Sequence, residues 1–187
     1  MQKYRISLLD LPPEGREFSL DDQAIWQDPL QEFHMDCRIL SPLATQVHVL
    51  PTESGCLIRG RLQGRVALPC NRCSEEAQTD INARFEDFEE LNCQDADLPM
   101  TQPGQDAETM PGAERIIYEG TSPMLDLAAV CWEEFMLALP VNPLCRPDCR
   151  GLCPQCGTNR NNGDCTCSAD EGDPRLAVLR NLKIRRQ

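Results

Sequence analysis

Cysteine is the residue type in this chain whose number and spacing point to chemistry. The chain has 12 cysteines, and six of them lie within 23 residues, at Cys145, Cys149, Cys153, Cys156, Cys165 and Cys167. Clustered thiols bind metal ions in reducing compartments, whereas disulfides form in oxidising ones. The first residues lack the basic and apolar pattern of an export signal. We therefore expect a cytoplasmic protein whose clustered thiols hold a metal ion.

Within this cluster, Cys153-Pro-Gln-Cys156-Gly157 has the form of a zinc knuckle. Two thiolates two residues apart bind one ion, and the glycine after them permits a tight turn. Cys165 and Cys167 are the preferred second pair, because an Asn-Asn-Gly turn can return them to the first. The alternative second pair is formed by Cys145 and Cys149. Four thiolates close a tetrahedron with no open position, which predicts one structural zinc ion.

Cys70 and Cys73 form a second Cys-x-x-Cys motif. The segments on either side alternate apolar and polar residues, which places the motif in the connection between two antiparallel strands. A redox dithiol would instead open a helix in a thioredoxin-like setting, which lowers the pKa of one thiol. We expect a structural turn or a half-site completed by Cys145 and Cys149. A thiol redox protein that uses Cys70 and Cys73 is an alternative function.

The elements that must position these cysteines are predicted from the spacing of apolar residues. Gly60 and Gly64 lie on the apolar face of one strand, where a missing side chain indicates a bulge or a bend. Ser122 as N-cap and Pro123 predict a helix that runs to about Leu139 and docks on the sheet. The predicted strands lie within residues 3–11, 46–49, 58–68 and 77–85. The fold class is α+β, a curved antiparallel sheet or partial barrel with a docked helix and a C-terminal zinc-ribbon-like appendage.

The composition divides the chain into two parts. Residues 1–140 form the predicted α+β domain, and residues 141–187 form a cysteine-rich, zinc-binding appendage that ends in a short basic helix. Residues at about 92–112 are acidic and rich in proline and glycine, so they have too little apolar surface to become ordered and are predicted to be a mobile loop. The chain has no run of about twenty apolar residues, and no membrane span is expected.

The net charge of -12 argues against a protein that coats nucleic acid with its whole surface. Local groups of basic residues remain as candidate RNA contacts. Those within residues 58–68 alternate with apolar residues, and a solvated face of a sheet shows the same alternation, which is the alternative interpretation. No catalytic triad, phosphate loop or paired carboxylate motif is present, which predicts a protein that is not an enzyme and has no small-molecule substrate. The candidate contacts are Arg59, Arg61, Arg65, Arg180, Lys183, Arg185 and Arg186.

Four motifs in a fixed order resemble the YceD-like family of large ribosomal RNA subunit accumulation proteins. They are GRVALPCNRC, LALPVNPLC, DCRGLCPQCGTNRNNGDCTC and DPRLAVLRNL, and the resemblance extends from about Cys70 to Leu182. It implies a bacterial cytoplasmic factor that supports 23S rRNA synthesis, processing or stability. Its expected partners are the precursor large ribosomal subunit, rRNA or ribosomal proteins. Some family members lack the C-terminal cysteines, so zinc would be a stabilising elaboration. A zinc-ribbon adaptor for another protein partner is a further alternative.

Overall fold

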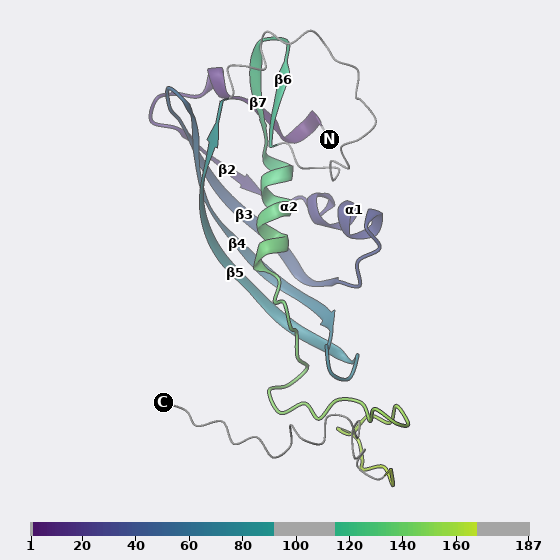
Figure 1. Ribbon diagram of the computed structural model, residues 1–187. Coiled ribbons are helices and arrows are strands. Elements are labelled where there is room, and N and C mark those ends of the chain that lie inside the picture. The colour runs from purple at the N-terminus through teal and green to yellow at the C-terminus, as the bar shows by residue number, and fades with distance from the viewer. Residues whose placement is uncertain (1, 92–114, 168–187) are drawn as a thin grey trace, which may run out of the picture.

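The computed structural model describes residues 2–91 and 115–167 (Figure 1). The predicted mobile loop at 92–112 and the predicted basic helix after Asp173 lie outside the described residues. Among the described residues, neither α-helix combines the length and the apolar character that a membrane-spanning segment needs. The elements are the 3-10 turns Gln2–Tyr4 and Leu8–Asp10, strands β1 (Arg5–Ser7), β2 (Arg16–Leu20), β3 (Arg38–Pro51), β4 (Gly55–Pro69), β5 (Glu76–Glu90), β6 (Ile116–Glu119) and β7 (Ser122–Asp126), and helices α1 (Ala24–Glu32) and α2 (Leu127–Ala138).

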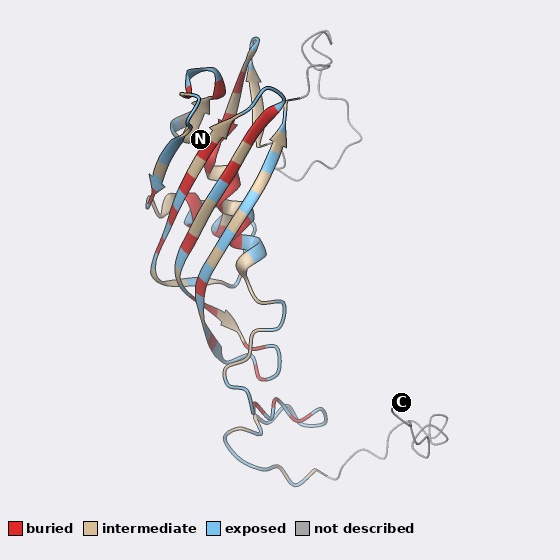
Figure 2. Cartoon of the chain, turned by 90° about the vertical axis from the view of Figure 1, so that its left-hand side faces the viewer, coloured by how far each residue is buried: buried red, intermediate tan, exposed pale blue. Residues whose placement is uncertain are grey.

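The main sheet has four antiparallel strands in the order β2-β3-β4-β5 and curves along its length (Figure 1). Helices α1 and α2 lie on its inner face, and the outer face is turned toward the viewer in Figure 2. Ile58, Leu62 and Val66 of β4 are fully buried on the inner face. A second sheet of three short strands has the order β1-β7-β6. The mixed helix and strand composition and the curved sheet were predicted, but the sheets do not close into a barrel.

The predicted irregularity at the glycines of β4 comes from close approach of neighbouring residues. A Cβ atom on Gly60 would lie 2.2 Å from the ring of Phe85, its partner on β5. A Cβ atom on Gly64 would lie 2.6 Å from a methyl group of Leu43. The register of β3 shifts beside Gly64, between Ile39 and Ala44. The bulge therefore lies on the partner strand, and Gly64 provides the space for it.

The predicted start of the docked helix, α2 in the structure, was wrong. Residues Ser122–Asp126 form strand β7, in which Pro123 pairs with Tyr118 of β6. Helix α2 begins at Leu127, and the Oδ1 atom of Asp126 accepts hydrogen bonds from the backbone N–H groups of Ala128 and Ala129 at 3.0 and 3.2 Å. The physical reason is that residues 122–126 pair with β6 and β1, so the helix begins only after them, where Asp126 caps it.

One hydrophobic core lies between the main sheet and the two helices. Trp26 of α1 and Phe135 of α2 are fully buried in it, together with apolar side chains of β3 and β4. A smaller cluster, separate from this core, contains Cys70, Cys73, Ala77 and Cys149. This second cluster lies at the turn between β4 and β5 and positions the candidate site.

Candidate metal centres

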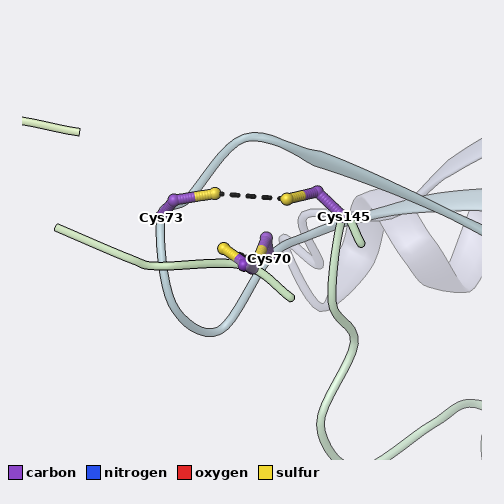
Figure 3. Close-up of side chains that lie close together, drawn as sticks. Cys70, Cys73 and Cys145 are labelled. Atoms are coloured by element: carbon purple, nitrogen blue, oxygen red, sulfur yellow. Dashed lines mark hydrogen bonds between the residues drawn. The ribbon is translucent and has the colours of Figure 1, made fainter. Parts of the chain in front are cut away.

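Eight cysteines gather into two groups of four near the turn between β4 and β5. We call the first group the hairpin tetrad and the second the tail tetrad. Within each tetrad, the four Sγ atoms lie within 4.8 Å of one another. Figure 3 shows the side chains of Cys70, Cys73 and Cys145 of the hairpin tetrad directed toward one another. The hairpin tetrad is Cys70, Cys73, Cys145 and Cys149, and the tail tetrad is Cys153, Cys156, Cys165 and Cys167.

The sulfur separations in the hairpin tetrad fit a bound ion. The Sγ atoms of Cys73 and Cys145 are 3.5 Å apart, and those of Cys70 and Cys149 are 3.8 Å apart. A tetrahedron with metal–sulfur bonds of about 2.3 Å has sulfur–sulfur edges of about 3.8 Å. The separation in a disulfide is only about 2.0 Å. Each tetrad can therefore hold a metal ion.

The two Cys-x-x-Cys turns have the same backbone hydrogen bonds. In the tail tetrad, the N–H of Gly157 donates to the carbonyl of Cys153 at 2.9 Å, and the N–H of Cys153 donates to Thr158 at 2.8 Å. In the hairpin tetrad, the N–H of Ser74 donates to the carbonyl of Cys70 at 2.9 Å, and the N–H of Cys70 donates to Glu75 at 2.7 Å. These bonds direct both thiols of each turn to one side. Both turns therefore have the backbone geometry that a metal knuckle requires.

Ser74 occupies the position that glycine takes in the other knuckle. Its φ of 61° and the φ of 73° at Gly157 are both in the left-handed region, which costs a residue with a Cβ about 1–2 kcal/mol. We expect Ser74→Gly to raise the free energy of unfolding of the metal-loaded protein by about 0.5–1 kcal/mol, because this relief exceeds the added entropy of the unfolded chain. Denaturant unfolding with excess metal measures it.

Gly157→Ser is the matched reverse change. Apart from the two adjacent residues, no atom of the described part of the chain lies within 4 Å of a Cβ built on Gly157, so the substitution tests backbone conformation without steric conflict. It should destabilise the tail tetrad by a similar amount. A lower stability of Ser74→Gly under the same conditions would contradict this account of the hairpin knuckle.

The residues between Cys70 and Cys73 fasten the cysteine-rich segment, residues 141–167, to the hairpin. The N–H of Asn71 donates to the carbonyl of Pro143 at 2.9 Å. The guanidinium of Arg72 donates to the carbonyl of Cys149 at 2.8 Å, and the N–H of Leu152 donates to the carbonyl of Arg72 at 3.0 Å. The turn thus holds the segment through these hydrogen bonds as well as through the cysteine contacts. The spacing of the cysteines gave no indication of these contacts.

Hydrogen bonds to sulfur favour the thiolate form at Cys149 of the hairpin tetrad and at Cys156 of the tail tetrad. The side-chain amide of Asn161 donates to Sγ of Cys149 at 3.3 Å and lowers the pKa of that thiol. The hydrogen bond between Thr158 and Cys156, 3.2 Å from Oγ1 to Sγ, lowers the pKa of Cys156 to about 6. Burial raises the pKa of Cys145. Four adjacent thiols cannot all ionise unless a cation neutralises them, because like charges repel.

Three other cysteines in the described residues lie away from both tetrads. Cys56 and Cys131 are fully buried in the main core, and Cys37 packs against it. Burial raises the pKa of Cys37 and Cys56 to about 11 and that of Cys131 to about 12. These thiols are therefore small apolar residues of the core.

The candidate RNA contacts in β4 lie on the outer face of the main sheet. Arg59 is paired with Glu86 of β5 at 2.9 Å, and Arg65 is paired with Asp80. Arg61 donates to the amide oxygen of Asn82 at 3.2 Å. Carboxylates thus neutralise two of the three arginines. The candidates Arg180, Lys183, Arg185 and Arg186 lie outside the described residues.

Comparison with known proteins gives a family and distant relatives. A family model described as "Large ribosomal RNA subunit accumulation protein YceD" matches residues 58–183. The chain is similar to "Large ribosomal RNA subunit accumulation protein YCED homolog 1, chloroplastic" of Arabidopsis thaliana, with 22% identity over 161 residues, 79% of this chain and 50% of the relative. Uncharacterized proteins of Mycobacterium bovis and Mycobacterium tuberculosis are 54% identical over 33 residues, 18% of this chain and 16% of each relative. The chain thus spans half or less of these relatives. No solved structure matches it.

Proposed function

Because the chain belongs to the family of large ribosomal RNA subunit accumulation proteins, we propose that it is a non-enzymatic factor in the biogenesis of the large ribosomal subunit. In this role it supports the synthesis, processing or stability of 23S rRNA in the bacterial cytoplasm. The observation that carries the proposal is the family match, which covers β5, α2 and every cysteine of both tetrads. The name of the Arabidopsis relative states the same kind of role.

Both tetrads are proposed to hold Zn²⁺ as a structural ion. Four thiolates are the ligand set that zinc prefers, and they leave no position for a substrate or a reactive water. The tail tetrad is the set preferred from the sequence. In the hairpin tetrad, Cys145 and Cys149 complete the half-site of Cys70 and Cys73 instead of competing for the tail ion. The proposal is therefore two ions per chain, one more than the sequence predicts.

Depletion of the protein from cells tests the role in ribosome biogenesis. We expect mature 23S rRNA to fall, precursor forms to accumulate and free large subunits to decrease in sucrose gradients, while 16S rRNA changes less. Expression of the wild-type chain should restore the levels. Unchanged 23S rRNA and unchanged subunit profiles after depletion would contradict the proposal. Co-purification with a partner unrelated to ribosomes, together with normal 23S rRNA, would favour a zinc-ribbon adaptor instead.

A thiol redox function has less support from the geometry. Cys70 and Cys73 lie in a turn between antiparallel strands, and their exposed fractions are only 2% and 4%. A redox thiolate must reach its substrate, so it needs an accessible sulfur. Titration of thiols in the native protein and again after chelation separates the two functions. Thiols that react only after the metal has been removed would support the structural role.

A further inference from the structure

A row of four polar side chains crosses the outer face of the main sheet. The register places Ser19 of β2 opposite Gln46 of β3, Gln46 opposite Arg61 of β4, and Arg61 opposite Arg84 of β5. Residues directly opposite each other in antiparallel strands have side chains on the same face, about 5 Å apart at Cβ. Two arginines are therefore held side by side near the middle of the sheet. Figure 2 shows that the helices lie behind this face.

This pair differs from the other arginines of the face in having no carboxylate. Arg59 and Arg65 are neutralised by Glu86 and Asp80. Among the described residues, the Arg61 side chain donates to the amide oxygens of Asn82 and Gln63 and meets no carboxylate. Within the described part of the chain, Arg84 is exposed and has neither an ion pair nor a hydrogen bond from its side chain.

Folding stability does not account for the arrangement. Like charges directly opposite each other on a sheet are destabilising. An acidic residue in place of one arginine would remove this repulsion, and acidic residues are abundant in a chain with a net charge of -12. Two adjacent guanidinium groups match the geometry of phosphate oxygens, to which each can donate two parallel hydrogen bonds. The pair thus has the chemistry of a site for a phosphodiester backbone.

An exposed aromatic ring on the same face narrows the class of ligand. The side chain of Phe88 is half exposed, and Phe88 follows Arg84 by four residues on β5, a distance of about 13 Å along a strand. An exposed ring can stack on an unpaired base, whereas paired bases are not accessible to it. Between the two positions, the face also carries the imidazole of His48 and the paired Arg59 and Glu86.

We propose that the outer face of the main sheet binds single-stranded RNA, with Arg61 and Arg84 on the phosphates and Phe88 stacked on a base. The proposal rests on the proposed function, because it identifies the contact through which the protein would act on rRNA. It changes the set of contacts expected from the sequence, since Arg84 enters the set while Arg59 and Arg65 are occupied by carboxylates.

Binding of a fluorescent single-stranded RNA of about twelve nucleotides to the purified, metal-loaded full chain tests the proposal. We expect Arg61→Gln and Arg84→Gln each to weaken the affinity about tenfold, as loss of a charged hydrogen bond does. Each should also lower the dependence of log K on log salt by about 0.7. Phe88→Ala should weaken binding about tenfold without changing this salt dependence. Arg65→Gln changes the net charge equally but should have little effect, because Arg65 is already paired.

The midpoint of thermal unfolding distinguishes a variant that has lost an RNA contact from a variant with a damaged fold. Arg84→Glu places a carboxylate opposite Arg61, so the midpoint of thermal unfolding should rise while RNA binding is lost. Equal weakening by Arg65→Gln and Arg84→Gln, or wild-type affinity of Arg84→Gln, would overturn the proposed site. Equal binding of a duplex of the same length would overturn the single-strand assignment. The binding assay needs no cells, so its failure is distinct from normal 23S rRNA after depletion, which would overturn the proposed function.

Discussion

Chelation of the purified protein under reducing conditions is expected to release two zinc ions per chain and to unfold the cysteine-rich segment, residues 141–167. Structural zinc in small sites contributes about 10–16 kcal/mol of binding free energy, which is also the folding free energy of the residues around it. The main sheet and both helices should persist, because the hairpin tetrad belongs to a cluster separate from the main core. Elemental analysis and hydrogen exchange along the chain measure both effects.

Substitution of single ligands assigns each ion to its tetrad. Cys149→Ser should remove one zinc ion and release the cysteine-rich segment from the hairpin. Cys165→Ser should also remove one ion but leave the hydrogen bonds of Asn71 and Arg72 protected from exchange. Cys37→Ser is the control, because Cys37 lies outside both tetrads and should keep both ions. A reduced protein without metal would contradict the zinc proposal.

The zinc content of the serine variants also tests which cysteines share an ion. If Cys165→Ser and Cys167→Ser kept full zinc while Cys145→Ser and Cys149→Ser lost both ions, the tail tetrad would be the wrong set. Full zinc in Cys70→Ser and Cys73→Ser would exclude the hairpin tetrad. Both results can be obtained from the same metal analysis, because each variant changes one sulfur to an oxygen that binds zinc poorly.

The tail knuckle was visible in the sequence because its parts are local. Cys153, Cys156 and Gly157 lie within five residues, and the backbone adopts the turn that the glycine permits. The hairpin knuckle was visible only as a half-site. Its sequence has Ser74 where glycine is the usual signal, and its other ligands, Cys145 and Cys149, lie more than 70 residues away. Spacing alone cannot show that a later segment returns to an earlier turn.

The helices show how tertiary contacts override local signals. Ser122-Pro123 is a good start for an isolated helix, but both residues pair with β6, and the rest of β7 also pairs with β1. Helix α1 was not predicted, because it is only nine residues long and contains Pro29, which cannot donate a backbone hydrogen bond. Burial of Trp26 in the core stabilises α1 in spite of this proline. Strand β1, which pairs with residues 124–126, and the core around Trp26 are made by parts of the chain that are distant in the sequence.

The arginine pair illustrates the same limit for function. Alternation placed Arg59, Arg61 and Arg65 on one face of β4, and the structure shows their side chains bonded to outward residues of β5. Which arginine meets a carboxylate depends on the register between β4 and β5. That register places Arg84 opposite Arg61, and no pattern within either strand indicates it.

Arg115 joins β5 and α2 through four carboxylates. Its Nη1 atom lies 3.0 Å from both Asp87 and Glu89 of β5. Its Nε and Nη2 atoms lie 2.7 Å from Glu133 and 3.4 Å from Glu134 of α2. Its own carbonyl accepts from the N–H of the helix cap Asp126 at 2.8 Å. Only 9% of the Arg115 side chain is exposed, so this guanidinium neutralises a partly buried acidic cluster between the sheet and α2.

Burial of Glu134 makes this cluster sensitive to pH. Burial, followed by the hydrogen bond to Asp87, raises the pKa of Glu134 from an ordinary 4.5 to about 7. A raised pKa means that the neutral form is favoured in the folded protein. The resulting stabilisation is complete below pH 4.5 and is lost as the pH rises through about 7. At higher pH the cluster depends more strongly on Arg115.

We expect Arg115→Met to lower the free energy of unfolding by about 3 kcal/mol at pH 8, because removal of one partner leaves buried charges unpaired. This is the lower end of the usual range, since Asp87 and Glu133 are 38% and 50% exposed and solvent screens their share. Without the guanidinium, the carboxylates take up protons more readily, so the decrease in the free energy of unfolding should become smaller toward pH 5. Denaturant unfolding at several pH values measures both the size and the slope.

Arg59→Met is the matched control on the same sheet. Arg59 also pairs with a glutamate across β4 and β5, but both side chains are more than half exposed, at 55% and 59%. Such a pair contributes about 0–1 kcal/mol, and its loss should change little between pH 5 and 8. If Arg115→Met and Arg59→Met cost the same, or if the cost of Arg115→Met did not fall with acidification, Arg115 would not be the ion that fastens α2 to β5.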